Sequence, residues 1–220
     1  MEPQAVGADD GGMRLLTVNV VEKLIPGPKE TGLTAIDKRP QVGRVRVGEL
    51  GLAGDRVCDT KNHGGPDLAV YAYAQEDADW WAAQLGREIP TGLFGENLRT
   101  EGVDITGALL GEVWRIGDEV EVMVRAPRIP CITFAHRMQE PRWVKRFHQA
   151  GRPGAYLKVL RTGTIGACDR VEVLSRPGHE VTIGHMFGAQ DPAKMQRMLD
   201  SGIDLMVELR ETAQRVVARG

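Results

Sequence analysis

The sequence predicts a mostly β protein, and three observations lead to that fold class. Short segments with an apolar residue at every second position recur along the chain, as in strands that are buried on one face. Glycine is abundant, with 27 residues spread over the 220 positions, and it supplies turns between such strands. No regular alternation of strand and helix recurs. Many short strands with frequent turns favour a barrel or a sandwich over a doubly wound α/β sheet.

The individual elements follow from the same patterns. The predicted strands lie at residues 15–20, 44–47, 119–125, 156–160 and 170–173, where valine and leucine alternate with polar side chains. Helices are predicted near 75–85 and near 141–149, the second with a proline in its first turn. These helices are expected at the periphery of the β-rich body.

The tail is expected to be a small extension of three helices. Thr182 is placed to cap a short helix at Ile183 to Phe187, and Asp191 precedes Pro192 as a cap precedes proline at the first helical position. The methionine-rich face of the tail is expected to pack on the body or in a homodimer, and docking of a partner is the alternative. The predicted division is therefore a polar, glycine-rich, disordered start at 1–12, a body at 13–178 and the extension at 179–220.

Composition excludes several functional classes. The formal net charge is −2, which does not indicate a basic surface for nucleic acid. No run of about 18 apolar residues predicts a membrane span. Three cysteines are too few, and odd in number, for a disulfide framework. The expected location is a reducing compartment, the cytoplasm.

Cys131 is the residue with the clearest chemical character. It ends the segment Arg128-Ile129-Pro130-Cys131, directly after an alternating strand. Proline fixes the backbone before the thiol, and Arg128 would favour its thiolate form. A thiolate is both a nucleophile and a soft metal ligand. Arg125 and Arg128 are also suited to bind an anionic group such as a phosphate. An ordinary buried cysteine is the alternative interpretation of Cys131.

Two further segments carry polar residues beside glycine. The loop Lys61-Asn62-His63-Gly64-Gly65-Pro66-Asp67 follows Gly54-Asp55, and its glycines would let backbone N–H groups approach a ligand. The segment Phe94-Gly95-Glu96-Asn97 places two polar side chains directly after a glycine. Each segment taken alone is more typical of a structural turn than of a ligand site.

Other mechanisms find no support in the residue spacing. The sequence contains neither CxxC nor HExxH, and its five histidines are scattered, which speaks against a zinc site. A cysteine protease would pair Cys131 with a histidine such as His136, but no local signature of that class is present. We interpret His136 as a surface or packed residue.

Taken together and in this order, these segments resemble the MOSC domain family, named after the C-terminal domain of molybdenum cofactor sulfurase. The likeness is closest to its stand-alone bacterial YiiM-type branch. The matching motifs are Gly54-Asp55, His63 to Asp67, Phe94 to Asn97, and Arg128 to Cys131. The resemblance covers about residues 13 to 175, and the tail resembles the three-helix extension of the same branch more loosely.

This resemblance implies a closed, mostly antiparallel β-barrel and a bound molybdenum cofactor, a molybdopterin. It implies that Cys131 is the protein ligand of the metal and that the surrounding residues form the cofactor pocket. The residues expected to bind the cofactor are Lys61, His63, Gly64, Gly65, Asn97, Arg125, Arg128 and Cys131. The expected catalytic residues are Cys131, His63 and Asp67, with the choice of proton donor between His63 and Asp67 left open.

The activity that the resemblance implies is reduction of N-hydroxylated small molecules such as hydroxylaminopurines. An external electron-donor protein would then be needed, since the sequence has no iron–sulfur cysteine set. Pyridoxal phosphate is not expected, because the chain is too short to include the pyridoxal domain of the full sulfurase. The alternative from a different class is a carrier module that delivers cofactor or sulfur, with a persulfide on Cys131.

Overall fold

The computed structural model describes residues 12–28, 32–58, 64–188 and 190–219. The predicted disordered start at 1–12 therefore falls outside the described residues except for Gly12. No helix in the described part of the chain is both long and apolar enough to cross a bilayer.

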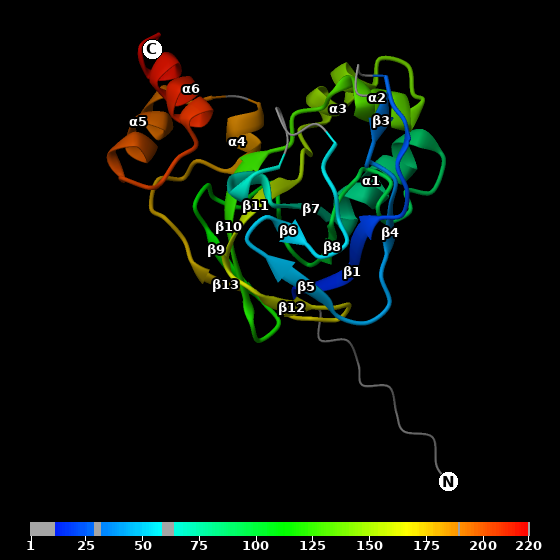
Figure 1. The fold of residues 1–220 in the computed structure, drawn as a ribbon. Helices are drawn as coiled ribbons and strands as arrows, with labels where there is room; N and C mark the ends of the chain where they lie inside the picture. The colour runs from blue at the N-terminus through cyan, green and yellow to red at the C-terminus, as the bar shows by residue number, and fades with distance from the viewer. Residues whose placement is uncertain (1–11, 29–31, 59–63, 189, 220) are drawn as a thin grey trace.

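An eight-stranded mixed sheet forms the centre of the molecule (Figure 1). Its order is β13-β9-β10-β11-β7-β8-β1-β4. In chain order these strands are β1 (Arg14–Val21), β4 (Lys38–Pro40), β7 (Val70–Ala74), β8 (Leu98–Glu101), β9 (Val113–Ile116), β10 (Val120–Pro127), β11 (Ala155–Arg161) and β13 (Val171–Ser175).

Two smaller sheets accompany it. The strands β5 (Val45–Gly48), β6 (Gly51–Leu52) and β12 (Gly163–Ile165) pair in the order β12-β5-β6, and β2 (Ile25–Pro26) pairs with β3 (Leu33–Thr34). The five alternating segments predicted from the sequence correspond to β1, β5, β10, β11 and β13.

The predicted closed antiparallel β-barrel is wrong. The two edge strands of the large sheet, β13 and β4, do not pair with each other, and no sheet closes among the described residues. One isolated bridge joins Arg14 to Arg170 without a strand ladder between β1 and β13. The sheet is also not purely antiparallel, because β7 and β8 run parallel. The helix between them makes this possible, since parallel neighbours need a crossover of a dozen or more residues.

Helices lie on two sides of the sheet (Figure 1). One group consists of α1 (Gln75–Leu85), α2 (Ile132–Met138) and α3 (Trp143–Ala150), and the other of α4 (Ile183–Phe187), α5 (Pro192–Asp200) and α6 (Val207–Val217). A single 3₁₀ turn, η1 (Pro66–Leu68), precedes β7. Both caps predicted in the tail are confirmed: the Thr182 side chain accepts a hydrogen bond from the His185 backbone N–H, and Asp191 accepts one from that of Lys194.

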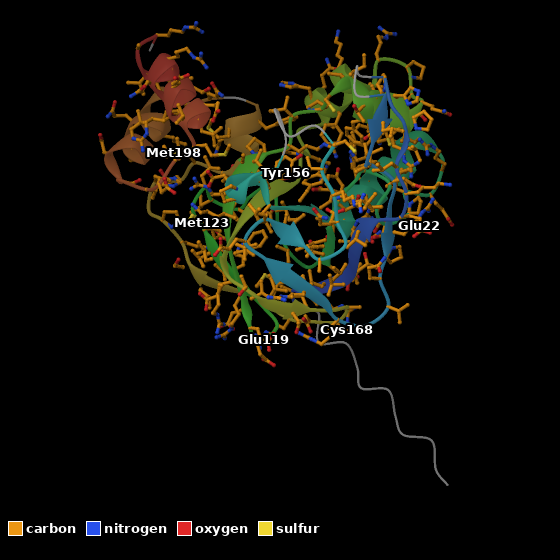
Figure 2. All side chains as sticks on the ribbon, viewed as in Figure 1. Glu22, Glu119, Met123, Tyr156, Cys168 and Met198 are labelled. Carbon is orange, nitrogen blue, oxygen red and sulfur yellow. The ribbon has the colours of Figure 1, made fainter. Side chains whose placement is uncertain are left out.

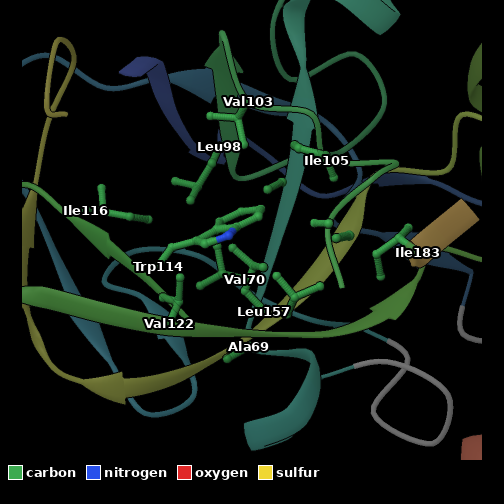
Figure 3. Close-up of a cluster of buried hydrophobic side chains, with 14 of the residues drawn as sticks. Ala69, Val70, Leu98, Val103, Ile105, Trp114, Ile116, Val122, Leu157 and Ile183 are labelled. Atoms are coloured by element: carbon green, nitrogen blue, oxygen red, sulfur yellow. The ribbon is translucent and has the colours of Figure 1, made fainter. Parts of the chain in front are cut away.

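Two buried clusters hold these elements together. The larger cluster fills the concave side of the main sheet, where Trp114 lies among Leu98, Val122 and Leu157 (Figure 3). It also includes Met195 and Met198, so the methionine-rich face of the tail packs on the body at these two residues. The second cluster is aromatic and lies beneath α1–α3, and its rings include Tyr71, Tyr73, Trp81, Phe94, Phe134, Trp143 and Phe147.

Candidate functional site

Cys131 lies where the long strand β10 gives way to helix α2. The chain leaves β10 at Pro127, and Cys131 takes the N-cap position of α2 with an extended backbone (φ −122°, ψ 173°). Its side chain is half-buried and lines a pocket, which we call the thiol pocket. Three other residues that are expected to bind the cofactor also line this pocket: Gly64, Asn97 and Arg128. Asp55 and Gly95, which belong to the predicted motifs, line it as well.

Arg128 is buried beside Cys131, with 6% of its surface exposed. One of its terminal nitrogens donates to the carbonyl of Phe94, and the guanidinium carbon lies 4.0 Å from the centre of the Phe134 ring. Burial alone lowers the pKa of this guanidinium, but Tyr71, Tyr156 and the Cys131 thiol raise it on balance. A permanent positive charge therefore stands next to the thiol. Its Nε atom is buried and has no hydrogen-bond partner among the described residues.

Asn97 reaches the pocket wall through a buried polar network. Its side-chain amide donates to Asp55 Oδ2 at 2.7 Å, and its side-chain oxygen accepts from the Tyr71 backbone N–H at 3.0 Å. Asp55 is in turn paired with Lys38, whose Nζ lies 2.5 Å from Oδ2. Burial lowers the pKa of Lys38 in spite of this carboxylate. Asn97 thus joins β7 to the Lys38–Asp55 pair, and its amide groups are already occupied.

Gly95 and Glu96, which precede Asn97 in the predicted segment, have structural roles. Glu96 is fully buried, forms an ion pair with Arg99 and accepts hydrogen bonds from the backbone N–H groups of Gly92 and Phe94. Gly95 has φ +76°, and a Cβ there would lie 2.9 Å from Ile36 Cγ1. The glycine is therefore required by backbone conformation and by a close approach.

Of the remaining predicted residues, those that the structure describes do not line the thiol pocket. Gly65 and Asp67 line a second hollow, which we call the helix groove because α6 forms one of its walls. Arg125 is buried beneath this region, where it pairs with Asp67 at 2.8 Å and with Asp204 at 3.3 Å. Its charge is thus balanced by two carboxylates. Lys61 and His63 lie outside the described residues.

The structure adds residues to the thiol pocket that the motifs did not single out. Lys38, Tyr71 and Tyr156 line it, as does Cys58. Burial raises the pKa of both tyrosine hydroxyls, so they stay protonated at neutral pH. Alternation in strand 156–160 could indicate which face Tyr156 takes, but no local signal places it beside Cys131.

Comparison with known proteins gives a consistent assignment. The sequence-family model of the MOSC domain matches residues 59–172 of this chain. The protein YflK of Bacillus subtilis is 36% identical over 143 residues, which cover 65% of this chain and 64% of that protein. A protein of Gibberella moniliformis named "Reductase" is 33% identical over 147 residues, which cover 66% of this chain and 26% of that protein. The aligned part of the chain thus spans less than two thirds of each of these two relatives.

A solved structure covers more of the molecule. The crystal structure of YiiM from Geobacillus stearothermophilus superposes with a TM-score of 0.74 and 28% identity, covering 93% of this chain and 98% of that one. The likeness therefore extends over the body and the C-terminal helices together.

Proposed function

This chain belongs to the MOSC domain family, and from that membership we propose that it is an oxidoreductase that reduces N-hydroxylated small molecules with a molybdenum cofactor. The observation that carries the proposal is the half-buried Cys131 thiol in a pocket beside the buried guanidinium of Arg128. The relative named "Reductase" supports the reaction class.

The residues of the thiol pocket fit such a cofactor. A cysteine thiolate is a soft donor of the kind that suits a metal bound by sulfur ligands. Arg128 brings a positive charge and an unpartnered Nε, and Lys38 and Arg56 bring further cationic side chains to the same pocket. These groups suit the anionic phosphate of a pterin cofactor.

When bound, the molybdenum cofactor supplies the two-electron redox chemistry of the reduction. The residues of this chain hold and position the reactants. Arg128 favours the thiolate of Cys131, which the metal requires of its ligand. Conversion of R–NHOH to R–NH₂ and water consumes two electrons and two protons. We propose that the protonated hydroxyl of Tyr156 binds the leaving oxygen.

The catalytic roles predicted for Asp67 and His63 remain proposals, and the described contacts bear on Asp67 alone. Asp67 is engaged by Arg125 and by Lys158, whose Nζ lies 3.4 Å away. These contacts favour a structural part for Asp67. We propose that an external electron-donor protein supplies the electrons.

Substitution of Cys131 tests the proposal. We would express the full chain in a host that makes the cofactor, then measure molybdenum per chain and reduction of a hydroxylaminopurine by a reduced dye. Cys131→Ser should lose both metal and activity. Cys168→Ser is the matched control, because Cys168 is exposed and lies at the lower edge of the molecule in Figure 2, away from Tyr156.

Two results would contradict the proposal. One is a Cys131→Ser protein that keeps both its molybdenum and its activity. The other is a native protein without turnover whose intact mass shows one added sulfur on Cys131, which would favour the carrier function instead.

A further inference from the structure

The helix groove lies between the β-rich body and the C-terminal helices. It has a volume of about 840 Å³, within the range of small-molecule sites. The connection from β10 to α2 forms one wall, α6 forms another, and η1 contributes to its lining. Figure 2 shows Tyr156 in the central part of the molecule, between the C-terminal helices and α2–α3 in that view.

The walls of the groove expose apolar side chains. Ile129 is 63% exposed and Val207 is 66% exposed, and both line it together with Leu209. Large apolar residues that gather in one exposed hollow are typical of ligand sites. These side chains suit the two faces of a flat ring.

The groove lies next to the thiol pocket. Gly64, Leu68 and Tyr156 line both hollows. A ring that lies against Ile129 and Val207 can therefore direct a substituent past Tyr156 toward Cys131.

Charge separates the two hollows. The charged residues that line the thiol pocket are Lys38, Asp55, Arg56 and Arg128. Lys38 and Asp55 pair with each other, so the two arginines leave the pocket with a net positive charge. The charged residues among the described lining of the groove are Asp67 and Glu208. Asp67 is neutralised by its ion pairs with Arg125 and Lys158. Glu208, in the first turn of α6, forms no ion pair with a described residue and leaves the groove with a negative charge. An anionic cofactor is thus favoured in the pocket, and a neutral or cationic ligand in the groove.

We propose that the helix groove is the substrate site, and that α6 determines its specificity for uncharged or cationic heteroaromatic amines over their phosphorylated forms. Val207 and Ile129 contact the ring, and the Glu208 carboxylate accepts hydrogen bonds from its N–H groups. The part of this inference that concerns turnover rests on the proposed function, whereas binding of the ring in the groove does not depend on it.

The experiment measures binding as well as turnover. Adenine serves as a ligand without a reducible N–OH group, and adenosine 5′-monophosphate as its phosphorylated counterpart. Dissociation constants are measured by calorimetry on the cofactor-loaded full chain, with molybdenum content determined in parallel. Val207→Trp fills the groove and Glu208→Gln removes its charge. Gln214→Trp and Glu211→Gln are the matched controls, because both residues are exposed on α6 and neither is among the residues that line the groove.

Adenine should bind more tightly than its monophosphate, and each groove variant should weaken adenine binding by about tenfold, as expected for the loss of one good contact. The control variants and the molybdenum content should not change. Glu208→Gln should also narrow the difference between adenine and its monophosphate.

Three outcomes would overturn the inference. They are binding that neither groove variant alters, tighter binding of the monophosphate, and a loss of molybdenum in Val207→Trp, which would assign the groove to the cofactor. If the protein held no molybdenum but adenine still bound and responded to Val207→Trp, the groove would stand as a binding site and the proposed function would fail.

Discussion

Each of the three tyrosines in this chain has its hydroxyl group in a setting that opposes ionisation. Burial raises the pKa of Tyr71, Tyr73 and Tyr156. Tyr71 donates to the Pro153 carbonyl at 2.8 Å and Tyr73 donates to the Arg152 carbonyl at 3.0 Å. The native protein therefore keeps these protons at a pH where free tyrosine loses them.

We expect the native protein to show little tyrosinate absorbance at about pH 10.5, slightly above the ordinary tyrosine pKa. Unfolding in guanidinium at the same pH should bring out the signal of all three rings. Because the unfolded chain then binds fewer protons than the native one, the tyrosines make stability fall as the pH rises above about 10. A native protein that already shows the full tyrosinate signal would contradict this.

Replacing the side-chain nitrogen of Asn97 by oxygen tests the polar network at the thiol pocket. Asn97→Asp replaces the amide that donates to Asp55 at 2.7 Å with a carboxylate oxygen. Two buried carboxylates then face each other, and we expect a loss of about 2–4 kcal/mol in the free energy of unfolding, measured in urea. Combining it with Asp55→Asn restores a donor at this contact and should recover part of the loss in a double-mutant cycle. Additive losses would show that the contact is not energetically important.

The sequence could predict which segments matter more readily than what each residue in them does. Gly95, Asn97, Arg128 and Cys131 do line one pocket. Arg125 is predicted as a ligand from its residue type, and Asp67 as an acid from the family resemblance. The ion pair between them depends on β10 and η1 meeting, which is a long-range contact.

At the scale of elements, Arg125 connects β10, η1 and the loop between α5 and α6. It pairs with Asp67 and Asp204, and it also donates to the backbone carbonyl of Asp204. Arg125 is 4% exposed, and its removal leaves Lys158, 3.4 Å from Asp67 and 3.5 Å from Asp204, as the cation beside these two carboxylates.

We expect Arg125→Met to lower the free energy of unfolding by about 1–3 kcal/mol, because the hydrogen bonds of a buried guanidinium are lost while Lys158 still pairs with both carboxylates. Amide hydrogen exchange in α6 should accelerate, because the loop that leads into α6 loses its anchor. Asp204→Asn is the control, because Asp204 is 68% exposed in its side chain and should cost less than about 1 kcal/mol. Unchanged exchange in α6 of Arg125→Met would show that other contacts hold this helix.

Strands with one solvent-exposed face could be predicted from the alternation of apolar and polar residues, whereas a fully buried strand could not. The alternating segments gave β1, β10 and β11, but every residue of β7 is buried, so that strand has no alternation to detect. Helix α1 matches its predicted range, yet nothing local indicates that it crosses over to make β8 parallel to β7. The closed sheet was implied by the family resemblance, and no local pattern could correct it, because strand order is set by contacts far apart in the sequence.

At the scale of the whole molecule, the body and the C-terminal helices share one core. Met195, Met198 and Ala213 belong to the same buried cluster as Trp114 and the strands of the main sheet. We therefore expect the body and its helical extension to unfold together. The free energy of unfolding of the whole chain then also reports on the contacts between the body and the extension.

His179 lies in that joint and makes it sensitive to acid. It is 1% exposed; its Nδ1 accepts from the Val181 backbone N–H at 3.0 Å, and its Nε2 lies 2.9 Å from the Leu110 carbonyl. These partners require the neutral ring with its proton on Nε2. Burial lowers the pKa of His179 below its ordinary value of 6.5.

The sign of the pH dependence follows from this lowered pKa. Below about pH 6.5 the histidine at position 179 is protonated in the unfolded chain but stays neutral in the native protein. Stability therefore falls as the pH falls. We expect urea unfolding to show a loss between about pH 7.5 and pH 5.5 that is smaller in His179→Leu, although this variant is less stable at every pH. His136→Gln, which alters an exposed histidine of α2, should keep the full dependence of the native protein. If His179→Leu kept that dependence as well, its source would lie in titratable groups other than His179, since no ring at position 179 would remain to titrate.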